Sequence, residues 1–276
     1  MTAPVLHFAD GREAADLAAF LARLIHYDRA AAVRLQAGGG VLAVFGRPPS
    51  FEVLAIRTAR LADPAAQADI TVSAGRLADA VDAARSERDG AGPSGPGAAA
   101  PVPGGLDVPV PEAVTGPPWT GVLPPRGGWR RVEGLPAGDA IRAAVGAAVA
   151  EFRARDESLP AEQRTRAQRD RIGREIWSRT LGDTGLPLRA VHAAQSLGFL
   201  RPVRVPARTA AAGAGQPAGG TGPAGPGGSG AAVLAPVAAE EQLALLAAAG
   251  WLRLRTPYGS IAVRTGGLSA LSLTPA

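Results

Sequence analysis

Apolar residues recur at two different spacings in the first ninety residues of the chain. From Asp10 onward they return every three or four positions, which is the period of an amphipathic helix. The residues that share this helical face are Leu17, Phe20, Leu21, Leu24 and Ile25. Asp10 and Glu13 stand at the spacing of a capping box, which favours a helix start at Asp10. The pattern therefore predicts a helix that packs on a sheet.

The segments that flank and follow this helix have strand patterns. Residues 33–36 and 41–45 surround a glycine turn at 38–40, which predicts a β-hairpin. Two further strands are predicted at 51–60 and 69–72, and the next residue, Ser73, can cap a short helix. With a strand around His7, the predicted order is strand, helix, a meander of four strands and helix, with the sheet covered on one side.

Residues 112–136, which we call the strap, have no such periodicity. Trp119 and Trp129 stand here among prolines and glycines. Each proline fixes φ and removes a backbone donor, so the strap is predicted to be extended and to form neither a helix nor an inner strand. Two interpretations stay open. Either the tryptophans are buried and tie two parts of the protein together, or the strap is a polyproline-type docking surface whose charged rim is Arg126, Arg130 and Arg131.

The second half of the chain is predicted to be mostly helical. Apolar residues at helical spacing predict helices at 138–155 and at 160–182. The second of these carries arginines on its outer face, among them Arg164 and Arg171, with carboxylates at intrahelical pairing distance, for example Arg166 with Asp170 and Arg171 with Glu175. The remaining predicted elements are a helix at 187–197, an edge strand at 199–205, a helix at 237–249 and a hairpin of 251–256 and 261–264.

Taken together, these elements predict the α+β class: an N-terminal helix and antiparallel sheet, the strap, and a helical C-terminal half that ends in a helix and a β-hairpin. Glycine, alanine and proline concentrate in two low-complexity segments, which are predicted to be disordered linkers. The predicted parts are an α+β domain at 1–88, a linker at 89–111, the strap at 112–136, a mostly helical segment at 137–208, a linker at 209–232, and a helix with hairpin at 233–276 that packs on 137–208.

Composition narrows the function classes. The 276 residues are 46% hydrophobic, which is enough for a core, and they include no cysteine, which excludes disulfides and thiolate chemistry. All 29 basic residues are arginine, but interleaved carboxylates reduce the net charge to +5, so only weak attraction to nucleic acid follows. The N-terminus has no leader pattern and no window is apolar enough for a membrane span, so we expect a soluble cytoplasmic protein.

Motifs for catalysis are not recognisable. The three histidines, His7, His26 and His192, have no metal-ligand partners at suitable spacing. The glycines at 38–40 precede a strand instead of a helix, so they form no phosphate loop. We therefore predict a protein that is not an enzyme, without catalytic residues, metal or cofactor.

Nucleic-acid binding is an alternative, because a helix followed by a hairpin is how a winged helix ends. In the hairpin, Arg253 and Arg255 could contact phosphates. In the helix at 187–197, the polar positions Arg189, His192 and Gln195 could contact bases. Glu240 and Glu241 in the helix before the hairpin oppose this interpretation, since they would repel the backbone.

Four sequence blocks, HFADGREAADLAAFL, GPPWTGVLPPRGGWR, DRIGREIWSRTLG and WLRLRTPYGS, stand in a lysine-free, Ala/Gly/Arg-rich chain. In these features the chain resembles an uncharacterised conserved protein family of high-GC actinobacteria (actinomycetes). The resemblance implies a cytoplasmic setting, but it supplies no mechanism and no catalytic or binding residues. Our hypothesis is a protein that binds another protein through the strap and the arginine-bearing helix. Regulation of chromosome segregation or of the division machinery is one role of this kind. Its oligomeric state is left open.

Overall fold

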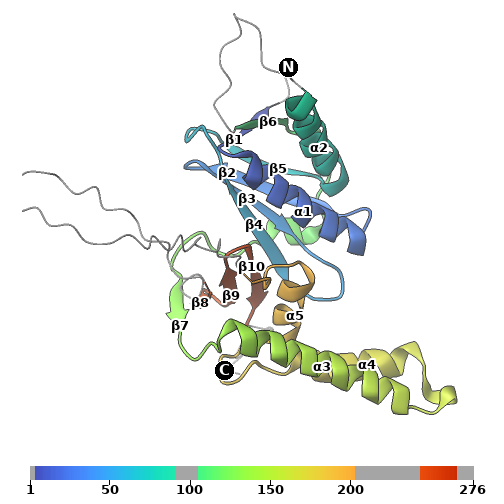
Figure 1. Cartoon of the computed structure of the whole chain (residues 1–276). Helices are drawn as coiled ribbons and strands as arrows, with labels where there is room; N and C mark the ends of the chain where they lie inside the picture. Colours follow the sequence, from blue (N-terminus) through green and yellow to red (C-terminus); the bar gives the residue numbers. More distant parts are fainter. Residues whose placement is uncertain (1–3, 91–104, 203–242, 266–276) are drawn as a thin grey trace, which may run out of the picture.

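The computed structural model describes residues 4–90, 105–202 and 243–265, which form an eight-stranded antiparallel sheet, a separate two-stranded sheet and helices (Figure 1). The strand order of the large sheet is β5-β2-β3-β4-β10-β9-β8-β7. Five α-helices accompany the strands in the described part of the chain. The predicted α+β class is therefore confirmed.

The first helix forms as the hydrophobic period predicts. Strand β1 (Val5–Phe8) leads into α1 (Gly11–Tyr27), and the Asp10 carboxylate accepts a hydrogen bond from the Arg12 backbone N–H at 2.9 Å. The buried face of α1 includes the predicted residues Leu17, Phe20, Leu21 and Leu24. The Glu13 carboxylate accepts instead from Arg60 at 3.1 Å, so it serves a tertiary ion pair.

The predicted hairpin is formed by β2 (Ala32–Gly38) and β3 (Val41–Gly46), and β4 (Leu54–Arg60) lies beside β3. The predicted four-strand meander is wrong at its last member, because β5 (Ala68–Ser73) pairs with β2. The free edge of β4 is occupied by β10 from the far end of the chain, so β5 pairs at the opposite edge.

Helix α2 (Ala74–Gly90) packs beside α1 on the same face of the sheet (Figure 1). Strand β6 (Leu106–Pro109) then pairs with β1. The predicted linker at 89–111 is therefore wrong at its end, since Leu106 and Val108 bury their side chains in the core. Residues 91–104 of that linker lie outside the described residues.

The strap crosses the face of the sheet opposite to α1, so the prediction that only one side is covered is wrong. It contains the short 3₁₀ helix η1 (Pro118–Gly121) and the strand β7 (Arg130–Val132), which lies at the edge of the sheet. Trp119 and Trp129 pack against a second apolar cluster on this face, which consists of Phe45, Leu54, Ile56, Trp251 and Ala262. Outside η1, the strap is extended, as its prolines predict, and its strand β7 lies at an edge; the prediction that it forms no helix is wrong for the single 3₁₀ turn of η1.

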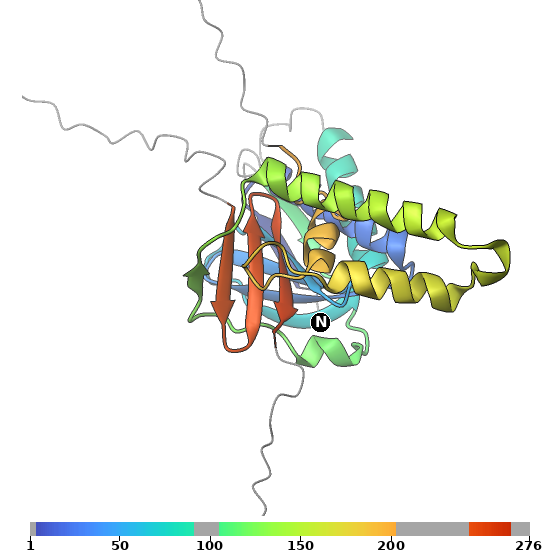
Figure 2. The same ribbon diagram turned by 90° about the horizontal axis from the view of Figure 1, so that it is seen from below.

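Helices α3 (Gly138–Ser158) and α4 (Arg166–Ser178) form an antiparallel arm that projects from the body (Figures 1 and 2). Helix α4 is shorter than the predicted 160–182, because its cap is Thr165, whose hydroxyl accepts from the Gln168 N–H. Residues 161–163 form a separate 3₁₀ turn, η2 (Ala161–Gln163). The buried face of α4 includes Ile172 and Ile176, as predicted.

Helix α5 (Leu188–Ser196) follows and packs against β10. The edge strand predicted at 199–205 is wrong for residues 199–202, which form a turn that buries Phe199 and Leu200, and residues 203–205 lie outside the described residues.

The end of the described chain is a three-stranded meander of β8 (Ala244–Ala248), β9 (Trp251–Thr256) and β10 (Gly259–Arg264) (Figure 2). The helix predicted at 237–249 is wrong for 244–248, and residues 237–242 lie outside the described residues. The tight turn at Ala249 and Gly250, with φ of 42° and 77°, folds β8 back onto β9, and this pairing overrides the helix propensity of alanine and leucine.

Strand β10 joins the two halves of the molecule, because it pairs with both β9 and β4. One main core accordingly contains residues from α1 and β2 as well as from α3, α5 and β9. The hairpin region packs on α5, as predicted, but it also completes the N-terminal sheet.

Candidate functional site

Three hollows meet around the loop between β3 and β4, residues 47–53. We call them the strap hollow, the central hollow and the arm hollow, and their volumes are about 710, 440 and 660 Å³. Glu52 lines all three. Arg47 and Trp119 are shared by the strap and central hollows, and Arg189 is shared by the central and arm hollows. Because they share these lining residues, the three hollows adjoin one another around the loop, and together they are our candidate site, which we call the groove.

The loop in the middle of the groove is held by packing on both sides. Pro48 and Val53 are buried, and the Phe51 ring makes edge contacts with Tyr27 and His192 at centroid distances of 5.7 and 5.2 Å. Ser50 and Glu52 have φ of 69° and 53°, which costs about 1 kcal/mol for each non-glycine residue. Backbone strain of this kind persists where the surroundings enforce it, and it is concentrated at functional sites.

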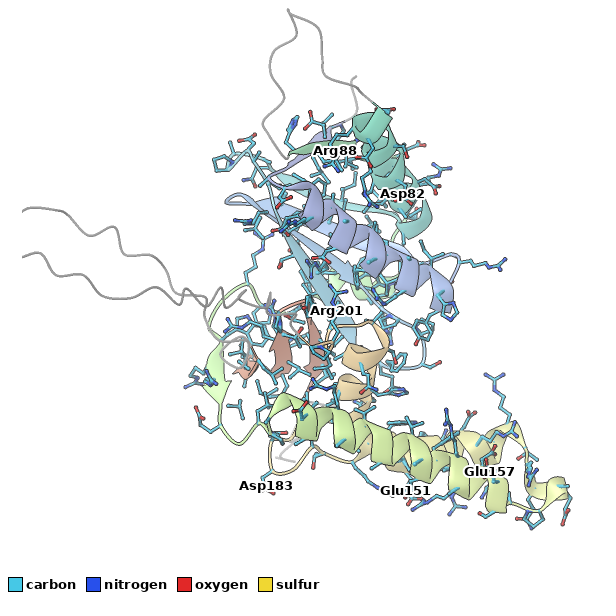
Figure 3. The ribbon with its side chains drawn as sticks, viewed as in Figure 1. Asp82, Arg88, Glu151, Glu157, Asp183 and Arg201 are labelled. Carbon is cyan, nitrogen blue, oxygen red and sulfur yellow. The ribbon has the colours of Figure 1, made fainter. Side chains whose placement is uncertain are left out.

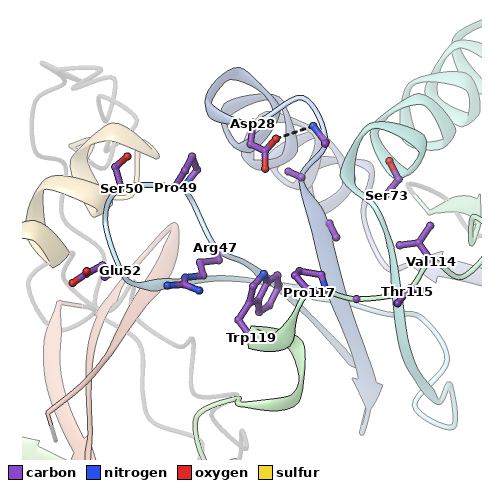
Figure 4. Close-up of a pocket in the computed structure, with 14 residues that line it drawn as sticks. Asp28, Arg47, Pro49, Ser50, Glu52, Ser73, Val114, Thr115, Pro117 and Trp119 are labelled. Carbon is purple, nitrogen blue, oxygen red and sulfur yellow. Dashed lines mark hydrogen bonds between the residues drawn. The ribbon is translucent and has the colours of Figure 1, made fainter. Parts of the chain in front are cut away.

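The strap hollow lies between the β3–β4 loop and the strap (Figure 4). The Arg47 side chain lies next to the Trp119 indole, with Pro117 beside it. At the far wall, the Asp28 carboxylate accepts from the Ala30 N–H at 2.9 Å, so its charge is partly satisfied by the backbone.

The central hollow has an apolar floor and a cationic rim. Leu54, Trp251 and Ala262 form the floor, and all three are buried. The rim includes Arg264, whose guanidinium lies 5.7 Å from the centroid of Trp251, and Arg189.

The arm hollow lies between α4, α5 and the loop. His192 stacks on Trp177 with ring centroids 4.3 Å apart, and Phe152 contributes another aromatic wall. Burial lowers the pKa of His192, so its imidazole is neutral at pH 7. Arg169 and Arg174 supply positive charge, and Arg169 is paired with Asp156, from Nε to Oδ1, at 2.7 Å.

Cations outnumber anions in the lining of the groove. The arginines are Arg47, Arg169, Arg174, Arg189 and Arg264, and the carboxylates are Asp28, Glu52 and Asp170. Within the described residues, Arg47, Arg174 and Arg264 form no ion pair. A ligand that carries carboxylates or phosphates beside apolar groups fits this arrangement.

Of the strap residues singled out from the sequence, only Trp119 lines the groove. Trp129 is half-buried, lies 5.8 Å from the guanidinium of Arg253, and donates its indole N–H to the Pro125 carbonyl at 3.0 Å. Arg126, Arg130 and Arg131 are exposed and line none of the three hollows. The tryptophans thus pack on the sheet, as the first of the two interpretations expects, while Trp119 also offers a surface to the groove.

The predicted arginines of the α4 region lie elsewhere on the arm. Arg164 donates to the backbone carbonyls of Glu157 and Leu159 at 2.8 and 2.9 Å, and Arg171 is exposed. The predicted pair of Arg166 with Asp170 forms at 3.9 Å. The predicted pair of Arg171 with Glu175 is wrong, because Glu175 pairs with Arg155 at 2.8 Å and with Arg179 at 3.5 Å.

Strap and α4 therefore line different hollows of the groove. The strap does so through Trp119, which sequence reasoning selected, and α4 does so through Arg169 and Arg174, which it did not select as binding residues. Arg47 and Arg264 were missed because their neighbours are distant in sequence. Arg174 was part of the arginine row but could not be told from its solvated neighbours.

The residues of the nucleic-acid alternative are also separated. Arg189 and His192 line the groove, and Gln195 is exposed on α5. Arg253 lies beneath Trp129 on β9, where burial, followed by the charge of Arg255, lowers its pKa. Because the predicted helix before the hairpin is strand β8, the helix-and-hairpin ending of a winged helix is not formed.

Within the described ranges, no helix has the length and apolar character needed to cross a bilayer. The same residues contain no group of three or more side chains suited to holding a metal ion.

Two family models match the chain. One is described as Domain of unknown function (DUF8010) and matches residues 1–104, and the other is described as Domain of unknown function (DUF8185) and matches residues 124–268. No curated protein and no solved structure matches. The groove lies where the two matched regions meet: the β3–β4 loop belongs to the first, Arg189 and Arg264 belong to the second, and Trp119 stands between them.

Proposed function

Because the chain belongs to the family described as Domain of unknown function (DUF8185), which names no activity, we propose a function from the groove. The protein is a non-enzymatic, cytoplasmic protein-interaction protein, and it holds an extended acidic segment of a partner protein.

The adjacency of the three hollows, which share Glu52 in their lining, is the observation that carries this proposal. A small-molecule site is usually a single enclosed pocket, whereas three open hollows in a row, of about 710, 440 and 660 Å³, suit an extended chain. The groove also gives the strap and α4 a common surface, through Trp119 at one end and Trp177 at the other.

The charge of the groove supports an acidic partner. Arg47, Arg174 and Arg264 are exposed and have no ion pair among the described residues, so the binding of carboxylates breaks no ion pair of these residues. Complementary charge of this kind raises the association rate and selects against cationic partners. An actinobacterial origin and a role beside chromosome-segregation or division machinery are the finer parts of this proposal, and they rest on the sequence resemblance alone.

Fluorescence anisotropy with three labelled probes tests the proposal: an acidic peptide of about twelve residues that also carries apolar residues, its neutral Asn/Gln counterpart, and random-sequence duplex DNA. We expect the acidic peptide to bind more tightly than the neutral one, and more weakly at about 200 mM than at about 50 mM salt. Arg47→Glu and Arg174→Glu, at opposite ends of the groove, should each weaken binding about tenfold or more. Arg126→Glu is the matched control, because Arg126 is exposed on the strap and lines none of the three hollows.

If Arg126→Glu weakens binding of the acidic peptide as much as Arg47→Glu does, the peptide binds outside the groove and the proposal is contradicted. Tighter binding to duplex DNA than to the acidic peptide, weakened by Arg255→Glu and not by Arg174→Glu, would replace it with a nucleic-acid function.

A further inference from the structure

The central hollow differs from its two neighbours in its lining. Two tryptophans face it, Trp119 from η1 and Trp251 from β9, and its floor contains Leu54 and Ala262. Trp251 is 8% exposed and Ala262 is fully buried, so the floor is part of the packed sheet and is preformed. The hollow offers a flat apolar guest two indoles and an aliphatic floor in a volume of about 440 Å³.

The cations around this hollow are incompletely satisfied. The Nε of Arg189 is buried and has no hydrogen-bond acceptor. Its nearest carboxylate oxygen, from Glu52, lies 3.7 Å away, which is too long for a hydrogen bond. Arg47 and Arg264 stand at the same rim without an ion pair among the described residues. The buried Nε of Arg189 is out of reach, but a carboxylate that enters the hollow would find the exposed guanidinium groups of Arg47 and Arg264 free of ion pairs with described residues.

The mouth of the hollow is also unpartnered. Val122 of the strap is 45% exposed, although its neighbours Trp119 and Leu123 pack against the apolar cluster on the sheet face. An exposed aliphatic side chain beside an aromatic hollow is the kind of surface that a partner covers.

We propose that the central hollow is the anchor of the groove, and that it takes an aromatic side chain of the partner with a carboxylate directly beside it. This inference rests on the proposed function and makes it more specific. The ring of the partner packs against Trp119 and Trp251, and the neighbouring Asp or Glu binds at the rim, to Arg264 and Arg47. Aromatic anchors in desolvated pockets, flanked by arginine, carry most of the binding energy in protein interfaces.

The test compares three labelled peptides of equal length in anisotropy titrations with the full chain. The first is acidic with one central tryptophan, the second is the same peptide with alanine in place of tryptophan, and the third keeps the tryptophan but has Asn and Gln in place of Asp and Glu. We expect the first to bind at least about tenfold more tightly than the second and the third.

Substitutions at the central hollow test whether the tryptophan of the peptide binds there. Val122→Asp places a negative charge at the mouth and should reduce the binding of the tryptophan peptide about tenfold or more. Val41→Asp is the matched control, because Val41 is similarly exposed, at 41%, and lines none of the three hollows. Arg264→Gln should reduce the advantage of the acidic tryptophan peptide over the neutral one, whereas Arg126→Gln should leave it unchanged.

The outcomes separate the anchor from the function on which it rests. If the acidic peptides with tryptophan and with alanine bind equally, and Arg47→Glu weakens both, the anchor is wrong and the acidic groove stands. If the neutral tryptophan peptide binds as tightly as the acidic one, the carboxylate part of the anchor is wrong. If Val41→Asp has the same effect as Val122→Asp, the tryptophan does not bind in this hollow. If no acidic peptide binds, the proposed function and the anchor fail together.

Discussion

Gly259, at the start of β10, lies against the ring of Phe199. A Cβ atom at Gly259 would stand 2.6 Å from that ring, which is itself buried and stacked on Phe20 at 5.7 Å. Phe199 is only 3% exposed, so its ring is packed among neighbours, and the φ of 153° at Gly259 is unfavourable for other residues. We expect Gly259→Ala to reduce the free energy of unfolding by about 2 kcal/mol or more, from overpacking and strain together.

Urea denaturation of three variants checks this expectation. Gly250→Ala changes a turn glycine with φ of 77° and open space around it, so it should cost only about 1 kcal/mol. Gly146→Ala, at an exposed position of α3, should be neutral or stabilising by up to about 1 kcal/mol. A loss for Gly259→Ala no larger than that for Gly250→Ala would show that the contact with Phe199 relaxes freely.

Single residues were predictable from sequence where a local rule governs them. The spacing of Leu17 and Leu21 and the cap at Asp10 are set within one helix, so the pattern is sufficient. The rim of the central hollow is different, since Arg47, Arg189 and Arg264 come from three elements that only the tertiary fold brings together. Nothing in the neighbourhood of any one of them distinguishes it from the other arginines of the chain.

The arm of α3 and α4 is held together on its exposed side by carboxylates between arginines (Figure 3). Glu151 pairs with Arg179 at 2.6 Å and with Arg155 at 2.7 Å, and Glu175 pairs with Arg155 at 2.8 Å. The pKa of Glu151 is lowered from its ordinary value of 4.5, mainly by the hydrogen bond that Arg179 donates. The pKa of Glu175 is lowered in the same way, mainly by the hydrogen bond that Arg155 donates. The ionised carboxylates therefore stabilise the packed arm.

The sign of the pH dependence follows from these lowered pKa values. The two carboxylates contribute fully to the stability of the arm above pH 4.5, which is the ordinary pKa of both groups. This stabilisation is lost as the pH falls through their lower folded-state pKa values. We expect amide protection factors in α3 and α4 to fall as the pH is lowered below 4.5, while those of β2 and β3 change less. Glu151→Gln should show the low-pH behaviour already at pH 7, and Glu157→Gln, near the end of the same helix, should not. Uniform loss of protection across the sheet and the arm would contradict this account.

Helices and strands were predictable where the hydrophobic pattern extends over the whole element. They were missed where pairing with a distant strand determines the secondary structure. The helix at α1 and the hairpin of β2 and β3 follow from local pattern. Strand β8 has the composition of a helix, Ala-Leu-Leu-Ala-Ala, and becomes a strand because β9 and β7 pair with it on both sides. Strand β6 is only four residues long, and its partner β1 stands about a hundred residues earlier, so no local signal marks it.

At the scale of the whole molecule, the regions matched by the two family models form one sheet and share one main core. A polar cluster reinforces this junction. The Asp16 carboxylate of α1 accepts from Arg57 of β4 at 2.9 Å and from Arg201, beyond α5, at 3.0 Å. Arg57 also donates to the Tyr258 carbonyl, and the guanidinium of Arg201 lies 3.9 Å from the centroid of the Tyr258 ring. We therefore expect the two regions to unfold as one unit.

Replacement of Asp16 tests that cooperativity, because all four tryptophans stand between residues 119 and 251, outside the first matched region. Asp16→Ala leaves the buried guanidinium of Arg57 without its carboxylate and should cost about 2 to 4 kcal/mol. In a single cooperative unit, the urea midpoints from tryptophan fluorescence and from far-UV circular dichroism should coincide and shift together. Asp82→Ala, which removes an exposed pair with Arg85, is the control and should change stability by less than about 1 kcal/mol. If Asp16→Ala shifts the urea midpoint from circular dichroism but leaves the midpoint from tryptophan fluorescence unchanged, the two regions unfold independently despite their common sheet.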